Sequence, residues 1–146
     1  MRKLSYTLAF ALIVFSFLCV TGYSHAGNLI IMLNIKDDAL TNDTPNNYII
    51  GNGIIKNNQS DMVLISSDAE KVTGTQSTYI FRGKNNPANK IKIRLGGDNW
   101  IADANDLGIV TNTKTTNNFN LYYVKDGIIV PDTYIINLYA EEINHK

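Results

Sequence analysis

The clearest structural pattern in this sequence is Lys90-Ile91-Lys92-Ile93-Arg94-Leu95, which continues as Gly96-Gly97-Asp98-Asn99-Trp100. Three apolar residues alternate with three cations, so Ile91, Ile93 and Leu95 share one face of an extended chain. The Gly96-Gly97 pair indicates a bend or bulge where this strand ends. The stretch therefore predicts a β-strand with one face toward a core and the other toward solvent.

Similar short runs of branched and aromatic residues recur along the chain, and Asn-rich segments separate them. Residues 27–146 contain 19 Asn, a residue that favours turns because its side chain bonds the local backbone. No window carries the apolar spacing of an amphipathic helix. The predicted strands are Asn28–Lys36, Tyr48–Lys56, Met62–Ser66, Thr78–Arg82, Lys90–Leu95, Phe119–Lys125 and Thr133–Glu141. This pattern predicts one all-β domain over residues 27–146, either a sandwich or a small barrel.

Two local features add detail to the predicted sandwich. The run Val130-Pro131-Asp132-Thr133-Tyr134 precedes the last predicted strand. Pro131 fixes φ at the turn, and a Tyr at the strand start suits the tyrosine corner of an immunoglobulin-like sandwich. An ordinary loop followed by a core tyrosine is the alternative. The only tryptophan, Trp100, is predicted to cover one end of the core, with a role in recognition as the alternative.

The N-terminus has the order of a secretory signal. Arg2 and Lys3 precede an apolar stretch over residues 4–20, and small residues lead to Ala26. We predict a signal peptide over residues 1–26, with cleavage after Ala26; an uncleaved membrane anchor is the alternative. The only cysteine, Cys19, lies within this segment. The remaining chain therefore forms no internal disulfide, and its stability must come from packing.

Charge and residue types exclude several functions for residues 27–146. The segment holds 11 basic and 13 acidic residues, so it lacks the basic field that nucleic-acid binding requires. Its only histidine is His145, which leaves no base for a Ser-His or Cys-His nucleophile and no His or Cys set for a metal. We therefore predict no enzyme, catalytic residues, cofactor, metal or small-molecule substrate. A binding or assembly module remains.

Three segments together resemble one bacterial family. They are the secretory start running into Gly27-Asn28-Leu29-Ile30, the stretch from Ile91 to Trp100, and the closing run from Val130 to Leu138. In these segments the chain is similar to the AfaD-like invasins, the minor tip subunits of Afa/Dr-type and aggregative adherence fimbriae of enteric bacteria. The family usually carries a cysteine pair, and this sequence has Ile55 and Glu142 near the corresponding places.

The resemblance implies an immunoglobulin-like sandwich that lacks its final strand. A periplasmic chaperone would cover the open groove, and an outer-membrane usher would exchange the chaperone for a donor strand of the major fimbrial subunit. The subunit would be exported through the periplasm to the fimbrium tip at the cell surface. There it would act as an adhesin or invasin on a host-cell receptor, with an integrin-type receptor implied. A self-contained secreted β-sandwich, acting as a binding or inhibitor module, is the alternative.

Strand alternation then predicts which residues line the groove. In the last strand, the face that carries Tyr134 is predicted to point inward. The groove candidates are Leu29, Ile31, Leu33, Ile35, Ile136, Leu138 and Ala140, and the structural candidates are Tyr134, Pro131, Trp100, Gly96 and Gly97. Ordinary closed core is the alternative for all the groove candidates. For receptor contact the pattern offers only Tyr122, Tyr123 and Tyr139, and a structural role is the alternative for each of them.

The distance from the predicted cleavage site to the first strand bears on position in the fibre. Only Gly27 separates Ala26 from the apolar run that begins at Asn28. If that run were donated to a neighbour, the sandwich would lack its own edge strand. We therefore expect a subunit that accepts a strand and donates none, as a subunit at the fibre tip does.

Overall fold

The computed structural model describes residues 29–36, 40–56, 62–75, 77–105, 107–111 and 118–143. The predicted signal peptide lies outside these residues and stays a prediction. Within them the chain forms ten strands and no helix that could cross a membrane. The strands are β1 (Ile30–Ile35), β2 (Tyr48–Lys56), β3 (Met62–Ser66), β4 (Glu70–Lys71), β5 (Thr78–Arg82), β6 (Lys90–Gly96), β7 (Ile101–Ala102), β8 (Gly108–Thr111), β9 (Asn118–Val124) and β10 (Tyr139–Ile143).

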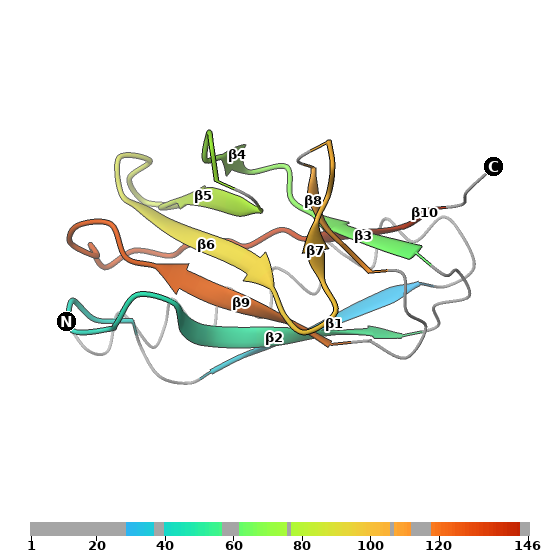
Figure 1. Ribbon diagram of the computed structural model, residues 1–146. Helices are drawn as coiled ribbons and strands as arrows, with labels where there is room; N and C mark the ends of the chain where they lie inside the picture. The colour runs from blue at the N-terminus through green and yellow to red at the C-terminus, as the bar shows by residue number, and fades with distance from the viewer. Residues whose placement is uncertain are drawn as a thin grey trace.

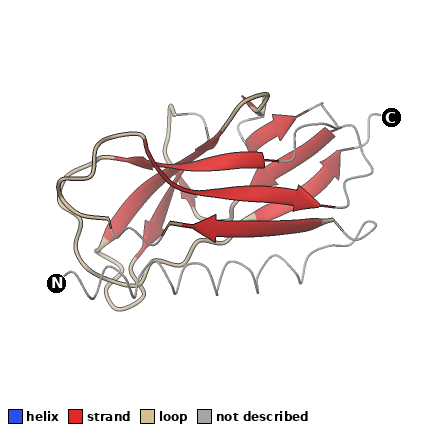
Figure 2. Cartoon of the chain, turned by 90° about the horizontal axis from the view of Figure 1, so that it is seen from below, coloured by secondary structure: helices blue, strands red, loops and turns tan. Residues whose placement is uncertain are grey.

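The strands form two antiparallel sheets packed as layers (Figures 1 and 2). The six-stranded sheet has the order β1-β2-β9-β6-β5-β4, and the four-stranded sheet has the order β10-β3-β8-β7. The expected all-β sandwich is confirmed. Chain order assigns β1-β2-β9-β6 to strands A-B-E-D of an immunoglobulin sandwich, and β3 and β10 to strands C and F. No strand among the described residues takes the G position beside β10.

The predicted strands agree with this architecture except at the end of the chain. The bounds of β2, β3 and β5 are those predicted, and those of β1, β6 and β9 differ by one or two residues. The predicted strand Thr133–Glu141 is wrong in its bounds, because the ladder with β3 covers only Tyr139–Ile143. The sequence pattern missed β4, β7 and β8. All four residues of β8 are buried, so no alternation marks it.

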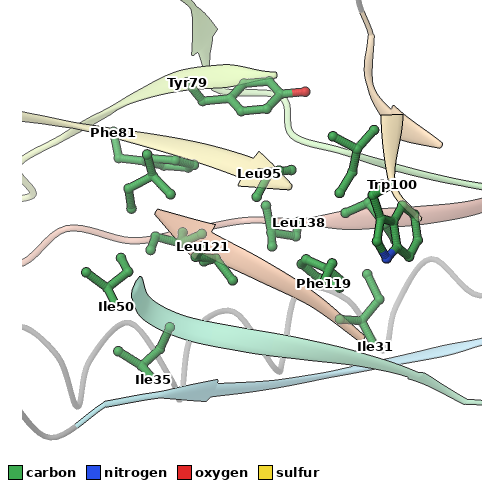
Figure 3. Packing of buried hydrophobic residues seen from close by; sticks show 14 of the residues in the cluster. Ile31, Ile35, Ile50, Tyr79, Phe81, Leu95, Trp100, Phe119, Leu121 and Leu138 are labelled. Carbon is green, nitrogen blue, oxygen red and sulfur yellow. The ribbon is translucent and has the colours of Figure 1, made fainter. Parts of the chain in front are cut away.

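The core lies between the sheets, and a close approach of two strands shapes its centre. Phe119 on β9 is fully buried over Gly53 of β2, where an added methyl group would overlap the phenylalanine ring. The rings of Trp100 and Phe119 pack edge to face, with 5.8 Å between their centroids (Figure 3). The indole Nε1–H of Trp100 donates to the carbonyl of Asn118 at 2.7 Å. Trp100 is 7% exposed, so it serves as core here.

Candidate functional site: the open edge between β1 and the C-terminal segment

Two strand edges lie on the same side of the sandwich without a described neighbour. β1 pairs only with β2 and ends the six-stranded sheet, while β10 pairs only with β3 and ends the four-stranded sheet. β1 and β10 contact each other across the layers. We call β1 together with residues 133–143 the open edge. A strand edge of this kind presents backbone groups that another chain can pair with.

The first half of the C-terminal segment has the side-chain pattern of a strand but not its pairing. Tyr134, Ile136 and Leu138 are fully buried and alternate with partly exposed residues. Residues 135–138 nevertheless belong to no ladder, and Tyr134 forms one isolated bridge to Gly83. The backbone therefore holds the position of a core strand, although this stretch is assigned to no ladder among the described residues.

The structure places all the predicted groove residues on the inner side of the open edge. Leu33 and Ala140 are partly buried and pack against the core cluster. The other five are buried in the core, three of them fully: Ile31, Ile136 and Leu138 are fully buried, and Leu29 and Ile35 are each 5% exposed. In this isolated chain their side chains fill the core rather than stand exposed, and what stays open is the backbone edge above them.

The start of the C-terminal segment has the geometry of a tyrosine corner. The hydroxyl of Tyr134 donates to the carbonyl of Val130 at 2.5 Å, as the corner requires. Burial raises the pKa of Tyr134, and the negative charge of Asp132 raises it further. The hydroxyl therefore stays protonated at neutral pH and remains a donor. Pro131 lies between these residues, partly buried, at the turn.

Asp132 forms a second anchor, which sequence reasoning missed. Its carboxylate is buried and accepts four hydrogen bonds: from the backbone N–H of Thr133 (2.7 Å), of Asn85 (3.0 Å) and of Asn86 (3.0 Å), and from Nδ2 of Asn89 (2.9 Å). Burial raises its pKa, but the hydrogen bonds outweigh burial and lower the pKa from 3.8 to about 2. This charged cluster ties the C-terminal segment to the β5–β6 turn.

The outer face of the larger sheet carries a third feature, built around Gly96. The guanidinium of Arg94 lies over the ring of Tyr122, 4.2 Å from its centroid. A side chain at position 96 would contact both groups, so Gly96 makes room for the stack. Nδ2 of Asn120, directly opposite Gly96 on β9, donates to the Tyr122 hydroxyl at 3.1 Å.

This stack lies in a broad surface depression of about 960 Å³, which extends past Gly97 to Trp100 and the loop before β5. Gly97 has a φ of 138°, a conformation that L-residues rarely adopt, so the glycine pair forms the turn at the rim. No acid among the described residues pairs with Arg94, whereas Lys92 and Arg82 each hold a carboxylate. The depression therefore presents a guanidinium whose charge is not neutralised by any carboxylate of the described residues.

The tyrosines suggested for receptor contact have different surroundings. Tyr123 is only 3% exposed, so its proposed contact role is wrong; its side chain belongs to the core. The hydroxyl of Tyr139 donates to Asp68 at 3.0 Å, and Tyr122 is partly exposed within the stack. Within the described residues no group of three His, Cys, Asp or Glu side chains could hold a metal ion.

Comparison with known proteins gives consistent matches. Residues 40–140 match the family described as Enterobacteria AfaD invasin protein. The crystal structure of SefD_dscA has 41% identity, with coverage of 82% of this chain and 89% of that one, at a TM-score of 0.74. The Escherichia coli Hda pilus minor tip subunit HdaB has 18% identity, with coverage of 77% of this chain and 81% of that one, at a TM-score of 0.68.

A third structure comes from the AAF fimbriae of enteroaggregative Escherichia coli. Those fimbriae are described as binding fibronectin and forming biofilms. The structure has 18% identity, covers 78% of this chain and 96% of that one, and gives a TM-score of 0.54. A search of curated protein sequences gave no match. The two matches at 18% identity support the shared fold alone.

The sandwich, its open edge and these matches define the class of protein. It is a bacterial invasin, an adhesive protein rather than an enzyme. The chain belongs to the AfaD invasin family. The resemblance stated from its sequence is thereby confirmed.

Proposed function

We propose that the open edge accepts a donor strand from the major fimbrial subunit, after a periplasmic chaperone has covered it and an outer-membrane usher has released it. The observation that carries this proposal is the stretch of residues 135–138, where Ile136 and Leu138 are buried as in a strand although the stretch belongs to no ladder. A donor beside it would occupy the G position of the sandwich and extend the sheet by one ladder.

A fused strand tests this proposal. A donor strand of the major subunit, joined after Lys146 through a short turn, would return antiparallel to β10. We expect the fusion to be monomeric and to unfold cooperatively at a much higher temperature than the bare chain, with the buried Trp100 as the fluorescent probe. A matched fusion, with prolines at alternate donor positions, removes the ladder donors and should give no gain.

The alternative, a self-contained secreted binding module, makes the opposite prediction. In that case residues 27–146 would be monomeric and stable alone, and the donor strand would add nothing beyond the proline-bearing control. That result would overturn strand acceptance.

We propose further that the subunit binds an integrin-type receptor on host cells through the depression around Arg94 and Tyr122. The supporting observation is a guanidinium over an aromatic ring with no acid partner among the described residues, which suits a receptor carboxylate. The substitution Arg94→Gln should reduce binding to immobilised integrin at least tenfold.

Arg82→Gln is the matched control, because Arg82 lies on the same outer face but its charge is already paired with Glu70 at 2.6 Å. Fibronectin on a parallel surface tests the ligand suggested by the AAF fimbriae. Equal binding by the two variants would refute the role of the depression. If Arg94→Gln reduced binding to fibronectin alone, fibronectin would replace integrin as the proposed receptor.

A further inference from the structure

The loop that follows β9 exposes apolar side chains at one end of the sandwich. We call residues 125–131 the apex loop; they connect β9 to the C-terminal segment. Ile128 is 76% exposed and Val130 is 43% exposed, the former being the most exposed large apolar side chain among the described residues. Neither packs against the core, whereas Ile129 between them does. Fold stability therefore does not account for these two side chains.

The apex loop is nevertheless held firmly in place. Nζ of Lys125 donates to the carbonyl of Asn42 at 3.0 Å, and the N–H of Ile129 donates to Oδ1 of the same asparagine at 2.9 Å. Asp126 forms an ion pair with Lys92 at 2.6 Å. These contacts fix both flanks of the tip. A rigid scaffold that presents exposed apolar side chains is typical of a binding loop, because little entropy is lost on contact.

The direction of the proposed donor strand determines what lies next to this loop. Every ladder in the structure is antiparallel, and the C-terminal segment runs from Tyr134 toward Ile143. An antiparallel donor would therefore end beside Tyr134, whose hydroxyl bonds to Val130 in the apex loop. In the assembly that the family resemblance implies, the donor strand is the N-terminal extension of its subunit, so its chain would continue from that point into the body of that subunit.

We propose that Ile128 and Val130 dock against an apolar patch on the body of the subunit that donates the strand, making a second contact beside the donor strand itself. This inference rests on the proposed strand acceptance. The partner is the donor subunit rather than a host receptor, because the apex loop is at the end of the sandwich where the donor body must emerge. The contact would fix the angle between the tip subunit and the fibre.

A single labelled cysteine tests the contact. Ile128→Cys in residues 27–146, a segment without a native cysteine, carries a polarity-sensitive fluorophore. Leu107→Cys is the matched control, since Leu107 is also an exposed apolar residue, 55% exposed, in the β7–β8 loop away from the apex loop (Figure 1). Each labelled chain is mixed with a synthetic donor peptide or with the intact major subunit, and Trp100 fluorescence during unfolding reports strand binding.

We expect both partners to raise the unfolding midpoint, and only the intact subunit to shift the emission at position 128 to shorter wavelength. The same subunit should leave the label at position 107 unchanged. If the midpoint rises but the label at 128 never shifts, or shifts equally with the peptide, the body contact is overturned while strand acceptance stands. If neither partner raises the midpoint, strand acceptance fails and the contact is overturned with it.

Discussion

The carboxylate of Asp132 stabilises the fold through charge, and the isosteric substitution Asp132→Asn isolates that effect. In the native chain, Oδ1 accepts from the N–H groups of Asn85 and Thr133, and Oδ2 accepts from Asn86 and Asn89. An asparagine at position 132 keeps one acceptor oxygen. Its NH₂ group, however, would face two donors where Oδ2 had accepted from both.

The loss of unfolding free energy in the Asp132→Asn variant can be estimated in two independent ways. Hydrogen bonds to a charged group contribute about 1.5–3 kcal/mol each, so loss of the two at Oδ2 should lower the free energy of unfolding by about 3 kcal/mol or more at neutral pH. The pKa of Asp132 is lowered from 3.8 to about 2. A shift of this size corresponds to about 2 kcal/mol of stability that depends on the charge.

The sign of the pH dependence follows from the lowered pKa. Because the folded chain holds the carboxylate more strongly than the unfolded chain does, this stability is fully present above about pH 4. It is lost as the pH falls through the range from 3.8 to about 2. The Asp132→Asn variant has no proton to gain at this position, so the difference between the two chains should shrink by about 2 kcal/mol over that range.

Urea unfolding of residues 27–146 from pH 2 to pH 7, followed by Trp100 fluorescence, measures this difference. Asp98→Asn is the control, because Asp98 is exposed in the turn after β6 and should leave the neutral-pH stability unchanged. If the curves of the native chain and the Asp132→Asn variant run parallel through the acidic range, the carboxylate does not hold the C-terminal segment through its charge.

Two further substitutions test the packing. Gly53→Ala would place a methyl group in the ring of Phe119 and should cost about 1–3 kcal/mol by overpacking; Gly74→Ala, in open space with a φ of 75°, should cost about 1 kcal/mol for backbone strain alone. Equal thermal shifts for the two would refute the close approach of β2 and β9. Tyr134→Phe removes only the hydroxyl bonded to Val130 and should cost about 1 kcal/mol in urea unfolding, whereas no loss would show that the corner does not depend on that bond.

How far the sequence predicts the fold depends on whether one face of a strand is exposed. The bounds of β2, β3 and β5 follow from apolar runs that end at turn-forming residues. The four residues of β8 are all buried, so they carry no alternation and resemble any short apolar run. Period-two alternation also predicts which side chains of residues 133–138 point inward. It does not predict pairing, because a ladder requires a neighbouring strand as well.

The anchors of the site are less accessible to sequence reasoning because they join distant residues. The spacing from Tyr134 back to Val130 is local, and the tyrosine corner could be considered from the sequence. The partners of Asp132 in the β5–β6 turn lie 43 to 47 positions away. Likewise, the stack of Arg94 on Tyr122 depends on the register of β6 with β9, which no local pattern specifies.

These anchors bear on how a donor strand could bind tightly. Fixing the backbone of one residue costs about 1–2 kcal/mol, so ordering the six residues from 133 to 138 at the moment of binding would cost about 6–12 kcal/mol. The charged cluster at Asp132, the tyrosine corner and the buried side chains of Ile136 and Leu138 already hold this segment extended. A donor would then lose only its own conformational freedom while gaining the ladder. The polar anchors at Asp132 and Tyr134 therefore contribute to assembly alongside the apolar residues of the open edge.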